Sequence, residues 1–224
     1  MVDSTLVFVD GENLATRYHQ MIRSGRLAAT DNIVIEDYFI WNQRVLDGFM
    51  WDIKRLSYYT SLVGDDDVIK SVIKNISDVK YTVKTGHFFD GLRGVGFTTA
   101  TNQIMPFVRK RKSRSRKESI CDVAITVDVM RACYRDHSQA IWLFSGDGDF
   151  TQLVSEVVHS GKRVVLSAFS SGLSPELRYV ADEFFCLDDV FFINDIGRSE
   201  VVPDILTAQK EHGTEAPAGQ VLEV

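Results

Sequence analysis

The residues with the clearest chemical potential are two aspartates, Asp147 and Asp149, which follow an apolar run and are separated by one glycine. In extended backbone, residues two apart project to the same side, so these carboxylates begin close together. Two like charges about 4 Å apart repel by roughly 4 kcal/mol at an effective dielectric of 20. Such a pair must protonate in part, spread apart or bind a cation. The stretch therefore raises the question of a cation site at the end of this run.

Two more aspartates stand at comparable positions. Asp10 ends the apolar run of residues 5–10, and Asp122 lies in the first turn of an apolar segment, residues 119–135, with helical spacing. Taken alone, each of these acids could instead open a turn or cap a helix, and Asp149 is a plausible N-cap. Their joint meaning depends on whether the fold brings them together.

The apolar pattern alternates between strand-like and helix-like segments, which is typical of a parallel sheet covered by helices on both faces. Short apolar or alternating runs predict five strands, at residues 5–10, 53–62, 80–88, 139–145 and 162–169. Apolar residues at helical spacing predict helices over residues 11–25, 68–76, 119–135, 150–161 and 174–182. The predicted fold class is α/β, with a mainly parallel central sheet of about five strands.

Two segments are less regular than the rest. The sequence does not decide whether residues 31–50 are helical or mixed. The helix predicted over residues 119–135 is apolar almost all round, which predicts that it is largely buried.

Right-handed crossovers place the carboxyl ends of parallel strands at one edge of a sheet, where α/β proteins bind ligands. Asp10, Asp147 and Asp149 would meet at this edge, and Asp122 would join them if its helix begins there. Oxygen ligands without histidine or cysteine nearby favour Mg²⁺ or Mn²⁺. These ions hold phosphate oxygens and lower the pKa of a bound water. We therefore predict a divalent-metal site formed by these four carboxylates.

Three polar residues near these motifs have competing interpretations. Asn13, one turn into the first helix, could hold a water or a phosphate, or it could be a surface amide. Ser145 could support the carboxylate of Asp147, or it could simply end the strand. Glu12 is expected to face solvent.

Asp128 follows Asp122 by six residues, which places it about 240° around the helix. It therefore does not share a helix face with Asp122. Ion pairing with Arg131, three residues further on, is the preferred interpretation of Asp128.

Positive charge is concentrated in one run. Residues 109–117 hold seven of the 25 Lys and Arg residues and no acid, in a protein of formal net charge −6. The run closes a long connection, residues 89–118, and long connections in compact domains are usually functional or mobile. A basic strip in an acidic protein indicates contact with a polyanion; the alternative is a solvated loop without a partner. The candidate nucleic-acid contacts are Arg109, Lys110, Arg111, Lys112, Arg114, Arg116 and Lys117.

The composition is that of a globular protein, with 45% hydrophobic and 25% charged residues. The chain has no apolar stretch long enough for a membrane span and no cationic segment before its first apolar run, so we expect a cytoplasmic protein. Its three cysteines have no C-x-x-C spacing and are expected to be reduced core thiols. Residues 1–192 are predicted to form one domain, and residues 193–224 a polar, flexible tail.

Five motifs together resemble the NYN domain, a branch of the PIN-like nucleases: FVDGENL (8–14), CDVAITVDVM (121–130), FSGDGDFTQLV (144–154), GKRVVLSAF (161–169) and LRYVADEFFCL (177–187). The resemblance implies a PIN-like three-layer α/β/α sandwich and a nuclease that depends on Mg²⁺ or Mn²⁺ and acts on RNA. On that pattern the catalytic and metal-binding site comprises Asp10, Asp122, Asp147 and Asp149, with Asn13 beside it. Asp128 matches a position that is commonly acidic in such domains.

Three functions follow as candidates. The first is a metal-dependent endoribonuclease in which Asp147 or Asp149 orients a water for attack on a phosphodiester; a DNase is a variant of it. The second is a nucleic-acid-binding regulatory module with little or no turnover. The third is a phosphotransfer enzyme for small molecules, which is disfavoured because the sequence DGEN lacks a D-x-D nucleophile pattern. We predict the ribonuclease, with nucleic acid as its partner, no contact with membranes, and self-association as an open alternative.

Overall fold

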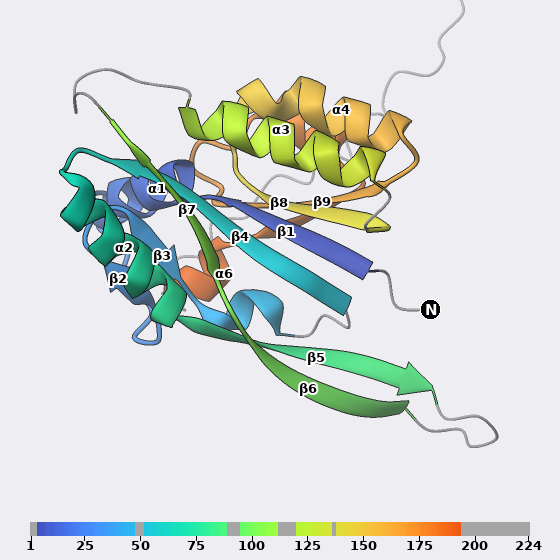
Figure 1. Cartoon of the computed structure of the whole chain (residues 1–224), viewed down its shortest axis with the longest axis horizontal. Helices are drawn as coiled ribbons and strands as arrows, with labels where there is room; N and C mark the ends of the chain where they lie inside the picture. Colours follow the sequence, from blue (N-terminus) through green and yellow to red (C-terminus); the bar gives the residue numbers. More distant parts are fainter. Residues whose placement is uncertain (1–3, 48–51, 89–94, 112–119, 136–137, 194–224) are drawn as a thin grey trace, which may run out of the picture. The chain divides into compact units, whose positions relative to one another are not determined.

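The computed structural model of this chain describes residues 4–47, 52–88, 95–111, 120–135 and 138–193 (Figure 1). All of these residues belong to one unit defined by contacts between residues, Met1–Asn194. The predicted tail therefore lies outside the described residues, except for Ile193. Within the described ranges, no helix has the length and hydropathy that a membrane span requires.

A six-stranded sheet forms the centre of the fold, and all pairs of neighbouring strands in it are parallel (Figure 1). Its strands are β1 (Ser4–Asp10), β4 (Asp52–Leu62), β7 (Met105–Lys110), β8 (Ala140–Phe144), β9 (Arg163–Ala168) and β10 (Glu183–Cys186). They lie in the order β10-β9-β8-β1-β4-β7, which puts β1 between β8 and β4. Because the strands run in one direction, their carboxyl ends share one edge of the sheet. The predicted parallel α/β fold is confirmed.

Helices cover both faces of this sheet. They are α1 (Gly11–Arg23), α2 (Asp66–Asp78), α3 (Ile120–Tyr134), α4 (Thr151–His159), α5 (Pro175–Val180) and α6 (Asp188–Phe191), with 3₁₀ turns at Gln43–Leu46 and Gly148–Phe150. Alternate side chains of a strand point to opposite faces. Accordingly, Val7 and Val9 of β1 enter the core that includes α1, whereas Leu6 and Phe8 enter the core under α3 and α4. This gives the three-layer sandwich, in which α3 and α4 lie side by side on one face (Figure 1).

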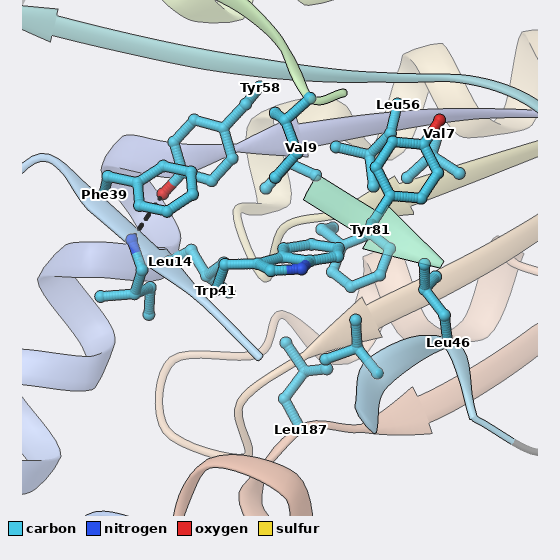
Figure 2. Close-up of a cluster of buried hydrophobic side chains, with 14 of the residues drawn as sticks. Val7, Val9, Leu14, Phe39, Trp41, Leu46, Leu56, Tyr58, Tyr81 and Leu187 are labelled. Carbon is cyan, nitrogen blue, oxygen red and sulfur yellow. Dashed lines mark hydrogen bonds between the residues drawn. The ribbon is translucent and has the colours of Figure 1, made fainter. Parts of the chain in front are cut away.

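Residues 31–50, whose type the sequence left open, contain a short antiparallel pair, β2 (Ile33–Ile35) and β3 (Phe39–Trp41). All three residues of β3 are fully buried. Figure 2 shows the ring of Trp41 in the apolar core on the α1 side of the sheet. The hydroxyl of Tyr58 on β4 accepts a hydrogen bond from the Ile40 amide at 3.1 Å, which ties this small pair to the central sheet.

Two predictions about the strands are wrong. Residues 80–88 form a strand, β5 (Lys80–Phe88), but it pairs antiparallel with β6 (Val95–Gln103) and not with the central sheet. The predicted loop over residues 89–118 contains β6 and also β7, an edge strand of the central sheet. With β7 and β10 the sheet has six strands, close to the number of about five that was predicted. β7 carries Pro106 and ends in bases, which are common in edge strands because they discourage further pairing; it therefore lacks the pattern of a buried strand.

The prediction that the helix over residues 119–135 is largely buried is only half right. Ile125 and Val129 of α3 are buried under it, but Val123 is 61% and Val127 47% exposed. The reason is that α3 covers the sheet from outside, so its inner face alone contacts the core. Apolar residues on both faces of a helix do not reveal which face is covered.

Candidate acidic site at the carboxyl edge of the sheet

Asp10 is the last residue of the central strand β1 and its side chain is buried, with the residue 2% exposed. One carboxylate oxygen accepts a hydrogen bond from the backbone N–H of Asn13 at 3.1 Å, so Asp10 also caps α1. The other accepts a hydrogen bond from the Ser145 hydroxyl at 2.9 Å. Burial raises the pKa of Asp10 to about 7; the two hydrogen bonds oppose this, and the nearby carboxylates of Asp122 and Glu12 add to it. The charged side chains that shift this pKa are both acids.

Ser145 connects the end of β8 to Asp10. It is fully buried, and its oxygen also accepts a hydrogen bond from the Asp147 amide at 3.1 Å. The hydroxyl thus supports the carboxylate of Asp10, and not that of Asp147 as one interpretation of the sequence had it. Ser145 fixes the relative position of the two strand ends that carry the acidic motifs.

Asn13 fixes the same loop from the other side. Its side-chain oxygen accepts a hydrogen bond from the Gly146 amide at 3.2 Å. Gly146 itself packs closely, since a Cβ at this position would stand 2.9 Å from the carbonyl oxygen of Gly172. The oxygen of Asn13 therefore holds the loop after β8 against α1, and neither of the two predicted roles for this side chain describes that contact.

Asp147 and Asp149 lie in the turn that follows. Asp147 accepts a hydrogen bond from the Asp149 amide at 3.1 Å and so caps the 3₁₀ turn Gly148–Phe150. The predicted capping residue was Asp149, but the helix begins with a 3₁₀ turn, which moves the cap two residues earlier. Asp147 is half-buried and Asp149 is exposed. The backbone between them is a 3₁₀ turn and not extended, and the role of both aspartates as metal ligands stays a prediction.

Asp122 enters the site from α3. It lies half-buried in the first turn of that helix and is close enough to Asp10 to raise its pKa. The neighbouring Cys121 is a buried free thiol whose pKa burial raises strongly, as do the nearby acids. The expectation that α3 begins at the acidic edge is therefore confirmed.

Glu12 is the functional candidate that sequence reasoning missed. Its carboxylate, 23% exposed, accepts hydrogen bonds from the Ser61 hydroxyl on β4 and from the guanidinium of Arg111 just after β7. It also accepts a weak bond from the Cys121 thiol at 3.5 Å. The expectation that Glu12 faces solvent is wrong, because the ends of β4, β7 and α3 converge on it. A signal was present in the sequence, since an acid two residues after Asp10 starts the same helix at the same edge.

Asp128 is held elsewhere on α3. One oxygen accepts from Arg131 at 2.5 Å, and the other accepts from the Tyr59 hydroxyl at 2.9 Å. The ion pair predicted from spacing is present. These contacts give Asp128 a role in attaching α3 to β4.

The basic strip is described only in part. Arg109 and Lys110 belong to β7, where the Lys110 amine lies 3.4 Å from the Asp66 carboxylate at the start of α2. Arg111 pairs with Glu12, and its side chain is 21% exposed. The remaining predicted nucleic-acid contacts, Lys112, Arg114, Arg116 and Lys117, lie outside the described residues.

The carboxylate oxygens at this edge suit Mg²⁺ or Mn²⁺, and the Cys121 thiol beside them donates its hydrogen bond to Glu12. A buried carboxyl whose charged neighbours are acids is also the environment in which a cation gives the largest gain. In the described ranges, however, no three carboxylate, imidazole or thiol groups stand close enough together to form a metal site. The residue types at this edge suit a divalent ion, and Asp10 and Asp122 are the first candidates for its ligands.

Comparison with known proteins agrees with the fold described above. The sequence matches the family model of the NYN domain over residues 4–188. A similar solved structure is that of VPA0982, a protein of unknown function from Vibrio parahaemolyticus RIMD 2210633, with a TM-score of 0.55 and 17% identity over 86% of this chain and 97% of that chain. At this identity the likeness supports the fold alone. Comparison with curated proteins finds no match. Because the family model covers most of its length, this chain belongs to the NYN domain family, a family of PIN-like nucleases.

Proposed function

We propose that this protein is a nuclease that depends on Mg²⁺ or Mn²⁺ and hydrolyses phosphodiester bonds of RNA at the acidic edge around Asp10. The observation that carries the proposal is the Asp10 carboxyl, buried at the end of the central strand with two further acids as its charged neighbours. Burial of a carboxyl among acids opposes its ionisation at neutral pH, and a cation at the site reverses this. The family gives the class of enzyme in which such a site cuts phosphodiesters.

A bound Mg²⁺ or Mn²⁺ would neutralise charge on the phosphate and lower the pKa of a bound water. The protein supplies orientation. The Ser145 hydroxyl and the backbone N–H of Asn13 each hold one oxygen of Asp10, so this carboxylate is positioned before any substrate arrives. Asp122, Asp147 and Asp149 are the proposed further oxygen donors. Because a carboxylate accepts several hydrogen bonds, the cap formed by Asp147 is compatible with a second contact.

The described part of the basic strip lies at the same edge. Arg109 and Lys110 end β7, which lies next to β4 in the sheet, and Arg111 follows directly. Pairing with phosphates would release counterions, so binding of nucleic acid should weaken steeply with salt. We propose that the strand to be cut follows these bases toward Asp10.

The test uses labelled RNA and DNA of one sequence, with Mn²⁺ and with excess EDTA. We expect cleavage of RNA with Mn²⁺, loss of cleavage in EDTA, and loss in Asp10→Asn. Asp67→Asn is the matched control, because Asp67 is an acid on α2 whose side chain is 90% exposed; it should cleave as the wild type does. Full activity of Asp10→Asn, or full activity in EDTA, contradicts the proposal.

A second candidate is a nucleic-acid-binding module with little turnover. The observation in its favour is that Asp147 is engaged in capping a turn. This candidate predicts salt-sensitive binding that persists in Asp147→Asn and falls when Arg109 and Lys110 are both changed to Gln. It predicts no cleavage with any metal. Cleavage of the DNA alone would instead identify a DNase.

A further inference from the structure

A polar cavity lies beyond the carboxyl end of β4, and the proposed chemistry does not use it. Its volume is about 680 Å³, within the range of about 300–1,000 Å³ that is common for small-molecule sites. Its walls come from the start of α1, the turn between β2 and β3, the end of β4 and one face of α2. Crevices outside the carboxyl ends of parallel strands are where α/β folds bind ligands.

The cavity borders both the acidic site and the basic strip. Glu12 lines it and is also one of the acids that act on Asp10. Arg111 lines it too, directly after the bases at the end of β7. A nucleic-acid strand that follows these bases toward Asp10 would pass the mouth of this cavity.

The charge of the lining excludes an isolated anion as the ligand. Glu12 and Arg111 neutralise each other through their ion pair. Glu36 and Asp37, from the turn between β2 and β3, then leave the cavity net negative. In the described part of the chain, neither carboxylate has a hydrogen-bonded or ion-paired partner. Both side chains are exposed, so they are open to a ligand with hydrogen-bond donors and no negative charge of its own at this point.

Part of the lining is apolar. Val63 and Val68 line the cavity and are 41% and 43% exposed. Beside them, Asn75 and Ser71 of α2 offer an amide and a hydroxyl. A nucleoside matches these features. Its flat base packs against the valines, the polar edge of the base hydrogen-bonds to the side-chain amide, and the ribose hydroxyls donate to the two carboxylates. Carboxylates that accept from ribose hydroxyls are a recurrent feature of nucleotide sites in α/β folds.

We propose that this cavity binds one ribonucleoside of the substrate strand, and that Glu36 and Asp37 accept hydrogen bonds from the ribose hydroxyls and so favour RNA over DNA. The 2′-hydroxyl is the group by which a protein tells the two apart. The proposal rests on the nuclease function and adds to it the place where the substrate sugar is recognised.

The test combines binding and cleavage. Ser71→Trp fills the cavity from an exposed position on α2, and Ile73→Trp places the same ring elsewhere on that helix as the matched control. Binding of adenosine and of 2′-deoxyadenosine is measured by ligand-observed NMR. Wild type and Ile73→Trp should bind adenosine more tightly than 2′-deoxyadenosine, and Ser71→Trp should lose at least tenfold in adenosine affinity. Equal adenosine binding by Ser71→Trp and wild type would overturn the proposal.

A second variant tests the carboxylates without filling the cavity. Glu36 has a positive φ of 49°, a conformation that Asn tolerates, so the change Glu36→Asn with Asp37→Asn keeps the turn. It should lower the ratio of RNA to DNA cleavage at least fivefold, with circular dichroism and melting temperature as the checks of folding. An unchanged ratio in an active, folded variant overturns the assignment while the nuclease function stands. Absence of cleavage by the wild type with retained adenosine selectivity overturns the nuclease function and leaves the nucleoside site.

Discussion

The hydroxyl of Ser145 donates a hydrogen bond of 2.9 Å to the carboxylate of Asp10 across 135 positions of sequence. Asp10 is the last residue of β1, and Ser145 directly follows the neighbouring parallel strand β8. This bond opposes the effect of burial on the pKa of Asp10. It also links the two acidic motifs, because the same oxygen accepts from the Asp147 amide.

Ser145→Ala removes this bond and leaves a buried carboxylate oxygen and a backbone amide without their partner. We expect a loss of about 1–3 kcal/mol in the free energy of unfolding and lower cleavage, measured by urea denaturation and by the RNA assay. Ser138→Ala is the control, because the buried hydroxyl of Ser138 has no hydrogen-bond partner among the described residues. Its stability should change by much less. Equal losses in the two variants would contradict the assigned role of Ser145.

The stability of the metal-free protein should depend on the ionisation of Asp10. Its pKa is raised by burial from an ordinary value of 3.8 to about 7, so the folded state binds this proton more tightly than the unfolded state does. The resulting stabilisation is present below about pH 4 and is lost as the pH rises to about 7. Asp10→Asn does not pass through this loss, so its stability advantage over the wild type should grow across the same range, by a few kcal/mol at most.

This pH dependence is checked by urea unfolding of both proteins in EDTA at intervals from pH 4.5 to 8.5. A stability difference that stays flat over this range speaks against a raised pKa. The same variant should be inactive in the nuclease assay. A gain in stability with a loss of activity is expected where a residue serves the reaction at a cost to the stability of the fold.

Divalent metal should stabilise the folded state. An ion that binds only the folded protein adds RT ln(1 + [L]/Kd) to the free energy of unfolding, about 2.7 kcal/mol at a concentration of 100 Kd. We expect Mn²⁺ or Mg²⁺ at millimolar concentration to raise the melting temperature of the wild type and of Asp67→Asn, but not of Asp10→Asn. Scanning calorimetry or dye-based melting measures the shift. If the wild type melts at the same temperature with and without metal, the proposed metal site is wrong.

The ion pair between Glu12 and Arg111 should be energetically coupled. Both side chains are more than three-quarters buried, and the removal of one partner leaves the other charge without compensation. Glu12→Gln and Arg111→Met should each destabilise the protein, and the double variant should lose less than the sum of the two. A double-mutant cycle by urea unfolding should give a coupling of about 1 kcal/mol or more. Strict additivity would show that the pair contributes nothing beyond its separate residues.

Local pattern was sufficient for the central strands and for the acids at their ends. The apolar runs before Asp10 and Ser145 form β1 and β8, and both reach the edge that the parallel topology predicts. Asp122 lies in the first turn of its helix, close to Asp10. These features depend on short-range periodicity and on the handedness of crossovers, which the sequence displays directly.

Pairing partners were beyond the reach of local pattern. β5 alternates as a strand should but pairs with β6, while β7, with its proline and bases, joins the central sheet. Strand membership depends on which distant segment supplies the hydrogen bonds, and the alternation of residues within one strand does not reveal that partner.

The amino-acid sequence by itself determined that this protein alternates strands with helices and carries aspartates at strand ends and a helix start, because those patterns repeat over a few residues. Only the tertiary structure decided that Ser145 serves Asp10, that Glu12 holds Arg111, and that a cavity opens beyond β4. Each of these relationships joins residues from different strands and helices. The physical reason is that hydrogen bonds and ion pairs act over a few ångströms in space, whatever their separation along the chain.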